Sequence, residues 1–396
     1  MLYFKDDESC QDMQNINLNN YIFDVDLSYI ETIPQANTNR CWLISAISEP
    51  ISRFRKETGL ADFKLSLNYI TFWDCMEKCE LFFDNIIRTS KFEIASQEVQ
   101  SILQAGIDDG GDWLNAAEII TKYGVVPECS MPETTASSDP EALYAVICRY
   151  VKHTASKLRT CKSAEQSFTL KQTALSEIRS YLATNCGEPP IDITVDSCLA
   201  RALNTGDAKI TALQLASRIF SDFFLNQISF VSVDSSFVMP NAKCIFPYNG
   251  YRIITPCAEY INIEFESLKE IILKQLLDGK AVPIACDARY SQNMSQRVFD
   301  IDSEGHPLAF TPHRNVGFDY RLLRINHSML VVGVKRISQN KYLWKLANSW
   351  AENPNDYYYA TDRWFNTFVF EAVIFRQYYS ETNLPVQKIL PNTIIL

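Results

Sequence analysis

The sequence predicts an α+β protein, with a helical N-terminal half followed by a C-terminal half built on an antiparallel sheet. Apolar residues recur at helical spacing up to about residue 226. From about residue 227, short runs rich in Val, Ile, Phe and Tyr predominate, as is typical of strands. The chain has 396 residues, 47% of them hydrophobic, which is enough core material for two or three domains or one large fold with insertions.

Three helices are predicted before residue 140. Pro50 lies inside the first and is expected to kink it, because proline removes a backbone donor. Ser66 is a good N-cap for the second, and Asp112 for the third. Gly124 suits the left-handed end of the third helix. The predicted spans are 41–54, 66–87 and 113–123.

The remaining chain divides into a helical insertion, broken near residues 187–190, and a strand-rich region. The expected strands are ISFVSV, YRIIT, AVPIAC, SMLVVGV, KYLWKLA and FVFEAVIF. A site shared by the two halves is expected in the cleft between them. The predicted divisions are an N-terminal arm (1–34), a helical half (35–140), a helical insertion (141–226), a sheet half (227–385) and a C-terminal segment (386–396).

Composition narrows the classes of function. The 37 basic and 47 acidic side chains give a net charge of −10, which argues against a nucleic-acid binder, since phosphate contacts require a concentrated basic surface. No apolar run is long enough to span a bilayer, and the start lacks the apolar core of a signal peptide. A cytoplasmic location is therefore expected, with the cysteines present as reduced thiols.

Cys41 is the preferred nucleophile among the twelve cysteines. It stands at the start of a predicted helix, after a loop of mostly short polar residues (35–40). A helix N-terminus and a nearby imidazolium both lower the pKa of a thiol, and the thiolate is the reactive form. Four other cysteines lie in apolar patterns and are interpreted as structural thiols: Cys75, Cys79, Cys148 and Cys286.

No metal site or cofactor is predicted. Cys75 and Cys79 form a tight pair at i, i+4, but no second pair stands at zinc-finger spacing. The chain also has only four histidines, which leaves few nitrogen ligands.

His327 is the preferred base, because it directly precedes the strand SMLVVGV, and a rigid strand can hold an imidazole at the edge of a cleft. His153 lies in a polar helix, and His306 and His313 flank the loop 307–310, where surface positions are expected. The ordinary alternative for His327 is a hydrogen-bonded histidine at the edge of the core.

Asn348 is the predicted partner of His327. A polar turn at 338–340 joins the two strands, and exact opposition of residues 327 and 348 would centre that turn between residues 337 and 338. The Asn348 amide would then fix the imidazole tautomer, with Trp350 screening the hydrogen bond from water. The alternative for Asn348 is a strand-end residue that starts a turn.

Gln35, six residues before Cys41, is the candidate donor to the oxyanion of a tetrahedral intermediate, beside the Cys41 backbone N–H. A single glutamine in a loop is otherwise simply solvated, so this prediction depends on the complete set of residues.

Together these residues resemble the papain superfamily. The matching motifs are the run 35–42 with Gln35 and Cys41-Trp42, then Asn326-His327-Ser328-Met329, then Asn348-Ser349-Trp350. More specifically, the chain resembles the bleomycin hydrolase and aminopeptidase C family of cysteine peptidases. Further motifs in collinear order support this: LSLNYITFWDCMEKCELFFDNII (65–87), DDGGDWLNAAEIITKYGVVPE (108–128), AVPIACD (281–287) and YYYATDRWFNTFVFEAVIF (357–375).

The resemblance implies a papain-like fold with a helical insertion and peptide substrates. By position it makes Cys41 the nucleophile, His327 the general base and acid, Asn348 the orienting residue and Gln35 the oxyanion donor. Gly110 and Gly111 match a glycine pair that lets a substrate backbone lie close in the cleft. Family members form ring-shaped hexamers, so a homo-hexamer is the oligomer that the resemblance suggests.

Three departures from the family pattern stand out. Asn39 replaces the glycine found two residues before the nucleophile, and Ala351 replaces the glycine after Asn-Ser-Trp. In the family, a C-terminal arm continues past a segment like PNTIIL and its last residue enters the cleft, whereas this sequence ends at Leu396. A more open cleft and internal cleavage of peptides are therefore expected beside the aminopeptidase action of the family.

Two other classes of function compete with an active peptidase. One is an inactive homologue that serves as a binding or assembly protein, since a fold does not guarantee its function. The other is a Cys-His acyltransferase or transglutaminase with similar geometry. The Asn-Ser-Trp motif and the flanking motifs argue against the latter.

Overall fold

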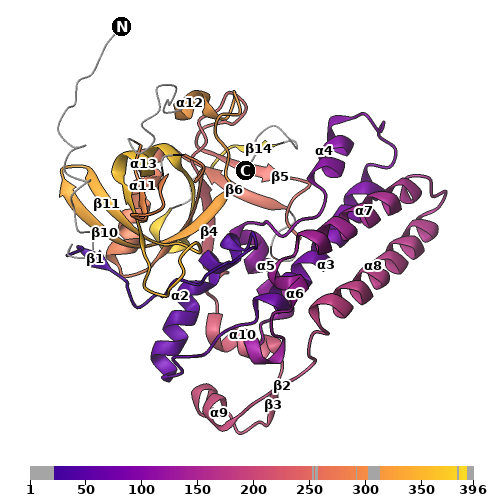
Figure 1. Ribbon diagram of the computed structural model, residues 1–396. Helices are drawn as coiled ribbons and strands as arrows, with labels where there is room; N and C mark the ends of the chain where they lie inside the picture. Colours follow the sequence, from indigo (N-terminus) through magenta and orange to yellow (C-terminus); the bar gives the residue numbers. More distant parts are fainter. Residues whose placement is uncertain are drawn as a thin grey trace.

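A computed structural model describes residues 22–251, 254, 257–290, 292–301, 313–380 and 383–389. Figure 1 shows most of the helices gathered on one side and the sheet on the other. Helix α2 (Cys41–Thr58) lies at the junction, because it packs against strand β10 (His327–Ser338) as well as against α5 (Trp113–Tyr123). The chain therefore places the start of α2 next to the sheet.

The helical half forms largely as its local sequence predicts. Ser66 accepts a hydrogen bond from the Tyr69 N–H, and Asp112 accepts one from the Asn115 N–H, so both predicted N-caps are confirmed. Pro50 sits within α2, which continues unbroken to Thr58. The helices of this half are α2, α3 (Leu67–Arg88), α4 (Gln97–Ala105), α5 and α6 (Thr135–Ser138).

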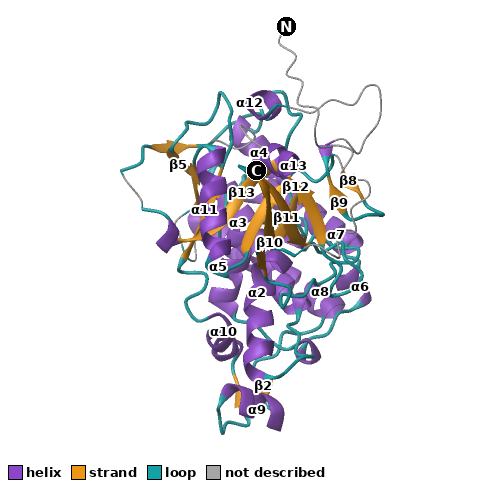
Figure 2. Cartoon of the chain, turned by 90° about the vertical axis from the view of Figure 1, so that its left-hand side faces the viewer, coloured by secondary structure: helices purple, strands orange, loops and turns teal. Residues whose placement is uncertain are grey.

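The insertion continues the helical layer. Helices α7 and α8 pack on α3, and α8 ends at Cys186 with Gly187 at positive φ, near the predicted break. Figures 1 and 2 both show α9 and β2 at the end of the molecule far from the sheet. The elements are α7 (Glu141–Leu158), α8 (Ala164–Cys186), β2 (Ile193–Thr194), α9 (Ser197–Leu203), β3 (Lys209–Ile210) and α10 (Ala212–Phe220).

The C-terminal half contains a large sheet, whose order within the described residues is β14-β5-β6-β4-β13-β7-β10-β11-β12-β9-β8. The expectation of an antiparallel sheet needs correction, because three pairs are parallel: β4 with β6, β5 with β14, and β9 with β12. The strands are β4 (Gln227–Val231), β5 (Ala242–Phe246), β6 (Ala258–Asn262), β7 (Val282–Cys286), β8 (Gln292–Asn293), β9 (Val298–Phe299), β10, β11 (Lys341–Ala347), β12 (Tyr358–Thr361), β13 (Val369–Phe375) and β14 (Val386–Lys388).

Helices also occur in this half, so it is not built from strands alone. They are α11 (Phe265–Leu277), α12 (Arg314–Gly317) and α13 (Asp362–Phe368). Of the expected strands, YRIIT is wrong where it is described, because Tyr251 and Ile254 belong to no strand. Its other three residues lie outside the described residues. The backbone N–H groups of Tyr251 and Ile254 instead donate to the buried Glu118 carboxylate.

The two terminal segments add strands to the sheet. Within the predicted N-terminal arm, β1 (Val25–Asp26) pairs with β10, although the sequence suggested an irregular segment. Strand β14 pairs with β5. The end of the predicted C-terminal arm, residues 390–396, lies outside the described residues, as do residues 1–21.

The main hydrophobic core runs through both halves, with Trp42 of α2 and Trp344 of β11 among its fully buried side chains. A second, smaller cluster packs Leu27 and Ile30 against Leu330 and Val332 of β10. Burial on both faces makes β10 a rigid element of the sheet. Among the described residues, no helix combines the length and hydrophobicity that crossing a membrane requires.

Candidate active site

Cys41 is the first residue of α2, and the N-terminus of this helix has no side-chain cap. The preceding residue, Arg40, makes no capping hydrogen bond, in contrast to Ser66 and Asp112 at α3 and α5. The free N–H groups at the start of α2 therefore remain available to a thiolate or to another anion beside Cys41.

The Cys41 thiol is held in its neutral form. Burial raises its pKa, and the Asp109 carboxylate adds a smaller effect in the same direction. Hydrogen bonds from the backbone N–H groups of Ser328, Trp42 and Cys41 itself act in the opposite direction. Since Ser328 follows His327, these contacts also place the thiol beside the start of β10.

The loop before Cys41 is fixed by polar contacts to distant parts of the chain. The Arg40 guanidinium binds the Glu133 carboxylate at 2.6 Å and the Ser137 carbonyl at 2.7 Å. The backbone N–H and side-chain amide of Asn39 each donate to the Asp109 carboxylate at 2.7 Å. These bonds hold the nucleophile loop, residues 35–40, in place although it has no regular secondary structure.

The two substitutions for family glycines cause no backbone strain. Neither Asn39 nor Ala351 has positive φ, so neither position requires glycine. In this loop Ala36, at φ 50°, takes the left-handed conformation. The Asn39 side chain helps to fix the loop, because its amide and its backbone N–H both donate to the Asp109 carboxylate.

Gln35 is anchored at both ends of its side-chain amide. Its Oε1 accepts from the Ser349 hydroxyl at 2.6 Å, and its Nε2 donates to the Thr38 carbonyl at 2.7 Å. The Gln35 backbone N–H also donates to the Ser349 carbonyl at 2.9 Å. The loop of the helical half is thus joined to the Asn-Ser-Trp segment of the sheet half.

His327 and Asn348 form the predicted pair, with 2.8 Å between His327 Nε2 and Asn348 Oδ1. The same Oδ1 accepts the Trp350 backbone N–H at 3.3 Å, which fixes the orientation of the amide. An oxygen facing Nε2 requires that Nε2 carries the proton. The lone pair of the neutral ring therefore lies on Nδ1, where it can accept a proton from a thiol.

Burial keeps the His327 ring neutral. The side chain is 4% exposed, and its desolvation lowers the pKa to about 4, against a smaller opposite effect of the Asn348 hydrogen bond. Trp350 stacks on the imidazole with ring centroids 4.2 Å apart. The predicted proximity of Trp350 to the pair is therefore confirmed.

The strand register differs from the predicted exact opposition. Leu330 pairs with Ala347, so Asn348 lies just beyond the end of β11 and not directly opposite His327. Two irregularities in the β10–β11 ladder, between Val331 and Gly333 and between Arg336 and Ser338, also shift the pairing. The Asn348 side chain reaches the ring because it is free of the ladder.

The candidate residues from the two halves converge. A small hollow between α2 and the sheet is lined by Cys41, Ser328, Asn348 and Ser349. Thus the structure brings the thiol, the Asn348 amide and the start of β10 to one place, although 286 residues separate Cys41 from His327 in the chain. Trp42, beside the nucleophile, donates from its indole N–H to the Asp109 carbonyl at 3.1 Å.

The two glycines at 110 and 111 have different surroundings. A Cβ on Gly111 would lie 2.8 Å from the Trp42 ring, so glycine is required there for packing. A Cβ on Gly110 would approach only the Asp108 carboxylate, at 3.3 Å. Contact of either glycine with a substrate stays a prediction, and Gly110 is the more open of the two.

The other candidate residues lie elsewhere. His153 is exposed on α7, His313 is exposed just before α12, and His306 lies outside the described residues. Cys75 and Cys79 are buried within α3 as free thiols.

Sequence reasoning missed Asp109 and Ser349 as supporting residues. Both belong to motifs that were recognised, next to Gly110 and Asn348, but their partners are distant in sequence and only the fold identifies them.

A thiol at a helix start, an imidazole on a facing sheet and an amide bonded to that imidazole define a cysteine peptidase of the papain-like class. The sequence model of the Peptidase C1-like family matches residues 4–395, so the chain belongs to this family. It is thus a cysteine peptidase related to the bleomycin hydrolases.

Individual relatives agree with this assignment. An aminopeptidase C of Listeria innocua is 29% identical over 356 residues, covering 88% of this chain and 80% of the relative. An aminopeptidase C of Lactobacillus helveticus is 26% identical over 370 residues, covering 89% and 81%. The crystal structure of PepW from Lactobacillus rhamnosis matches with a TM-score of 0.83 at 24% identity, over 93% of this chain and 88% of PepW, which supports the fold.

Proposed function

We propose that Cys41, His327 and Asn348 are the catalytic group of this peptidase, with Gln35 as oxyanion donor. The observation that carries the proposal is the His327–Asn348 hydrogen bond, which leaves Nδ1 as the proton acceptor, while the next residue, Ser328, donates its backbone N–H to the Cys41 thiol. A base oriented by a third group is the arrangement that activates a weak nucleophile.

The proposed reaction has two stages. The Cys41 thiol gives its proton to His327 Nδ1, and the sulfur attacks the carbonyl carbon of the scissile peptide bond. The oxyanion accepts hydrogen bonds from the Cys41 backbone N–H and from the second hydrogen of Gln35 Nε2. Nδ1 then protonates the departing amine, which leaves a thioester. Water, deprotonated by Nδ1, hydrolyses this thioester and restores the thiol.

We further propose that the peptides are shortened from their N-termini. Support comes from the relatives named aminopeptidase C, which align over most of this chain. Internal cleavage of peptides is the alternative, and it would be detected in the same experiment.

The test uses one peptide with a free N-terminus and its N-acetylated form, with the products identified by mass. Stepwise loss of residues from the free peptide, with no cleavage of the acetylated one, is expected. Internal fragments from both forms would replace aminopeptidase action with endopeptidase action. No cleavage of any peptide, together with no labelling of Cys41 by a thiol-reactive peptide analogue, would support the inactive homologue.

A cytoplasmic location and a homo-hexamer remain predictions. Eleven cysteines of the described residues are free thiols, which suits a reducing compartment. Light scattering on the purified protein would determine the mass of the assembly.

A further inference from the structure

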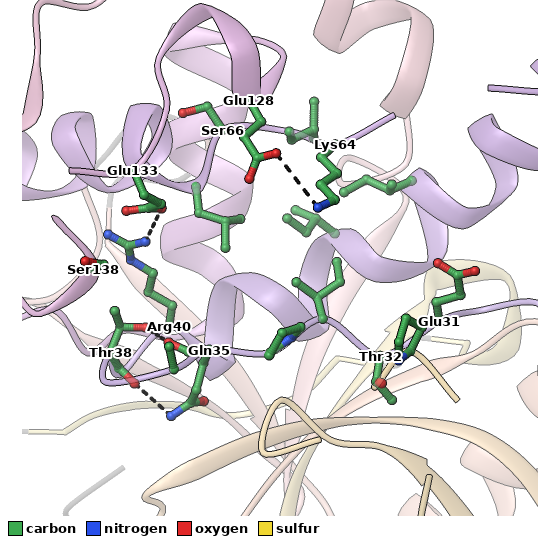
Figure 3. Close-up of a pocket in the computed structure, with 18 of the residues that line it drawn as sticks. Glu31, Thr32, Gln35, Thr38, Arg40, Lys64, Ser66, Glu128, Glu133 and Ser138 are labelled. Carbon is green, nitrogen blue, oxygen red and sulfur yellow. Dashed lines mark hydrogen bonds and ion pairs between the residues drawn. The ribbon is translucent and has the colours of Figure 1, made fainter. Parts of the chain in front are cut away.

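A cavity of about 400 Å³ lies beside the nucleophile loop. It adjoins the hollow that contains Cys41, with which it shares Thr32 and Ile33 in its wall. Figure 3 shows that its labelled residues come from the segment 31–40, from the segment that leads into α3 and from the segment 128–138, and α2 also contributes to the wall. Its volume falls within the range of about 300–1,000 Å³ that is usual for small-molecule sites. Neither the fold nor the peptidase mechanism assigns it an occupant.

Part of the cavity wall is apolar. Ile47 and Ile51 of α2 contribute to it, together with Leu65, Leu67 and Met131. Ile47 and Ile51 are buried side chains of the main core, so the wall is fixed by packing. A ligand that fits this wall needs a branched or aromatic apolar group.

Charges of both signs surround the apolar wall. Arg40, Arg55 and Lys64 face four glutamates, so the formal charges nearly cancel and a ligand with a single charge has no overall advantage. The four glutamates are Glu31, Glu128, Glu133 and Glu352.

The pair Lys64–Glu128 is the weakest of the ion pairs in this cavity. Its charged atoms are 4.0 Å apart, and the two side chains are 63% and 49% exposed. Figure 3 shows both charged groups directed toward the middle of the cavity. Such a pair contributes little in itself, so each partner can bind a ligand charge at small cost.

Arg40 gives a second indication of a ligand. It is 4% exposed and lines the cavity, and its Nε is buried without a hydrogen-bond partner among the described residues. A buried donor without an acceptor costs free energy that a ligand oxygen would recover.

We propose that this cavity binds a free α-amino acid with an apolar side chain. The carboxylate lies at Lys64, the ammonium lies at Glu128, and the side chain packs on the apolar wall. The zwitterion matches the near-neutral ring of charges, because it brings one charge of each sign. The uncharged side chain fills the apolar part.

The site would touch the catalytic loop, because Gln35 and Arg40 both line the cavity. An amino acid bound there would lie against the residue that directly precedes Cys41. Under the proposed function, such amino acids are the released products, so the cavity would be a product site outside the cleft. That last identification rests on the proposed function, whereas binding itself does not.

Titration calorimetry with the full-length protein, alkylated at Cys41, tests the proposal without any turnover. L-Leucine should bind in a 1:1 ratio. Glycine, leucinamide and 4-methylpentanoate lack the side chain, the carboxylate and the ammonium respectively. Leucinamide and 4-methylpentanoate should each bind at least about tenfold more weakly, since one hydrogen bond to a charged group is worth about that factor. Glycine should also bind at least about tenfold more weakly, because it buries no apolar side chain.

Variants locate the site. Lys64→Gln and Glu128→Gln should each weaken leucine binding about tenfold, whereas Lys341→Gln, at the exposed first residue of β11, should not change it. Absence of leucine binding, equal binding of leucinamide, or unchanged affinity in both cavity variants would overturn the proposal. Because no step requires peptidase activity, failure here is distinct from failure of the proposed function.

Discussion

The two sides of the candidate active site are built differently. The base side belongs to the sheet: the proposed base, His327, begins β10, is almost fully buried, and has Asn348 and Trp350 around its ring. On the nucleophile side, Cys41 begins α2 and is preceded by a loop without regular structure, residues 35–40. This loop is held by separate hydrogen bonds to Asp109, Glu133 and Ser349.

The His327 imidazole and the Cys41 thiol are therefore positioned in two different ways. Burial in a sheet fixes the imidazole and lowers its pKa, so the base is neutral before substrate binds. The loop around Cys41 leaves helix N–H groups uncapped and uses side chains to hold its shape. Changes on the base side should therefore alter protonation, whereas changes in the loop should alter position.

The largest effect is expected for the nucleophile. Cys41→Ser should reduce kcat by a factor on the order of 10⁴ or more, because a hydroxyl is far less acidic and only a weak neutral base faces it. Circular dichroism should show an intact fold. Cys75→Ser is the matched control: it should lower the melting temperature but keep turnover, since Cys75 is buried in α3. Full activity of the Cys41 variant would reject the assignment.

The next effect concerns the donor in the loop. Gln35→Glu keeps an acceptor for the Ser349 hydroxyl but removes the amide donor, and with it the bond to the Thr38 carbonyl, so kcat should fall by about 10²–10³-fold with little change in KM. Ser349→Ala removes only the support of Gln35 and should cost much less. Equal losses in the two variants would mean that Gln35 acts by holding the loop and not as an oxyanion donor.

A third prediction concerns pH and the base side. The His327 pKa is lowered from 6.5 to about 4, so the native state binds fewer protons than the unfolded state between these values. The neutral His327 ring therefore makes its full contribution to the free energy of unfolding above pH 6.5. This contribution declines as the pH falls toward 4. The loss amounts to on the order of 3 kcal/mol.

Urea unfolding of the protein and of His327→Gln at pH 7 and pH 4 measures this contribution. The stability of the wild type relative to the variant should decrease toward pH 4, because glutamine does not titrate. Parallel pH curves for the two proteins would show that the ring is not held neutral by burial.

The smallest effect is expected at Asn39. Asn39→Gly restores the family residue and keeps the backbone bond to Asp109 while losing the side-chain bond, so stability should fall by about 1 kcal/mol and activity should change only a few-fold. Asn39→Asp places a second carboxylate against Asp109 and should be clearly worse than glycine at pH 7. If aspartate and glycine behave alike, Asn39 does not contact Asp109 in solution.

The sequence by itself determined the local features of this protein. The caps at Ser66 and Asp112 are visible in sequence because each bond joins residues three positions apart. His327 and Asn348 were also identified as a pair, since a hairpin joins neighbouring strands and a polar turn marks its centre.

Only the tertiary structure decided the contacts between distant segments. The parallel pairs of the sheet, the bond from Gln35 to Ser349 and the bonds from Asn39 to Asp109 join residues far apart in the chain. The same holds for Gly111, which lies in a loop, because the Trp42 ring that requires glycine there belongs to helix α2. Helix caps and turns depend on a few adjacent residues. Contacts between distant segments exist only after the segments have packed together, as α2 packs against both α5 and β10.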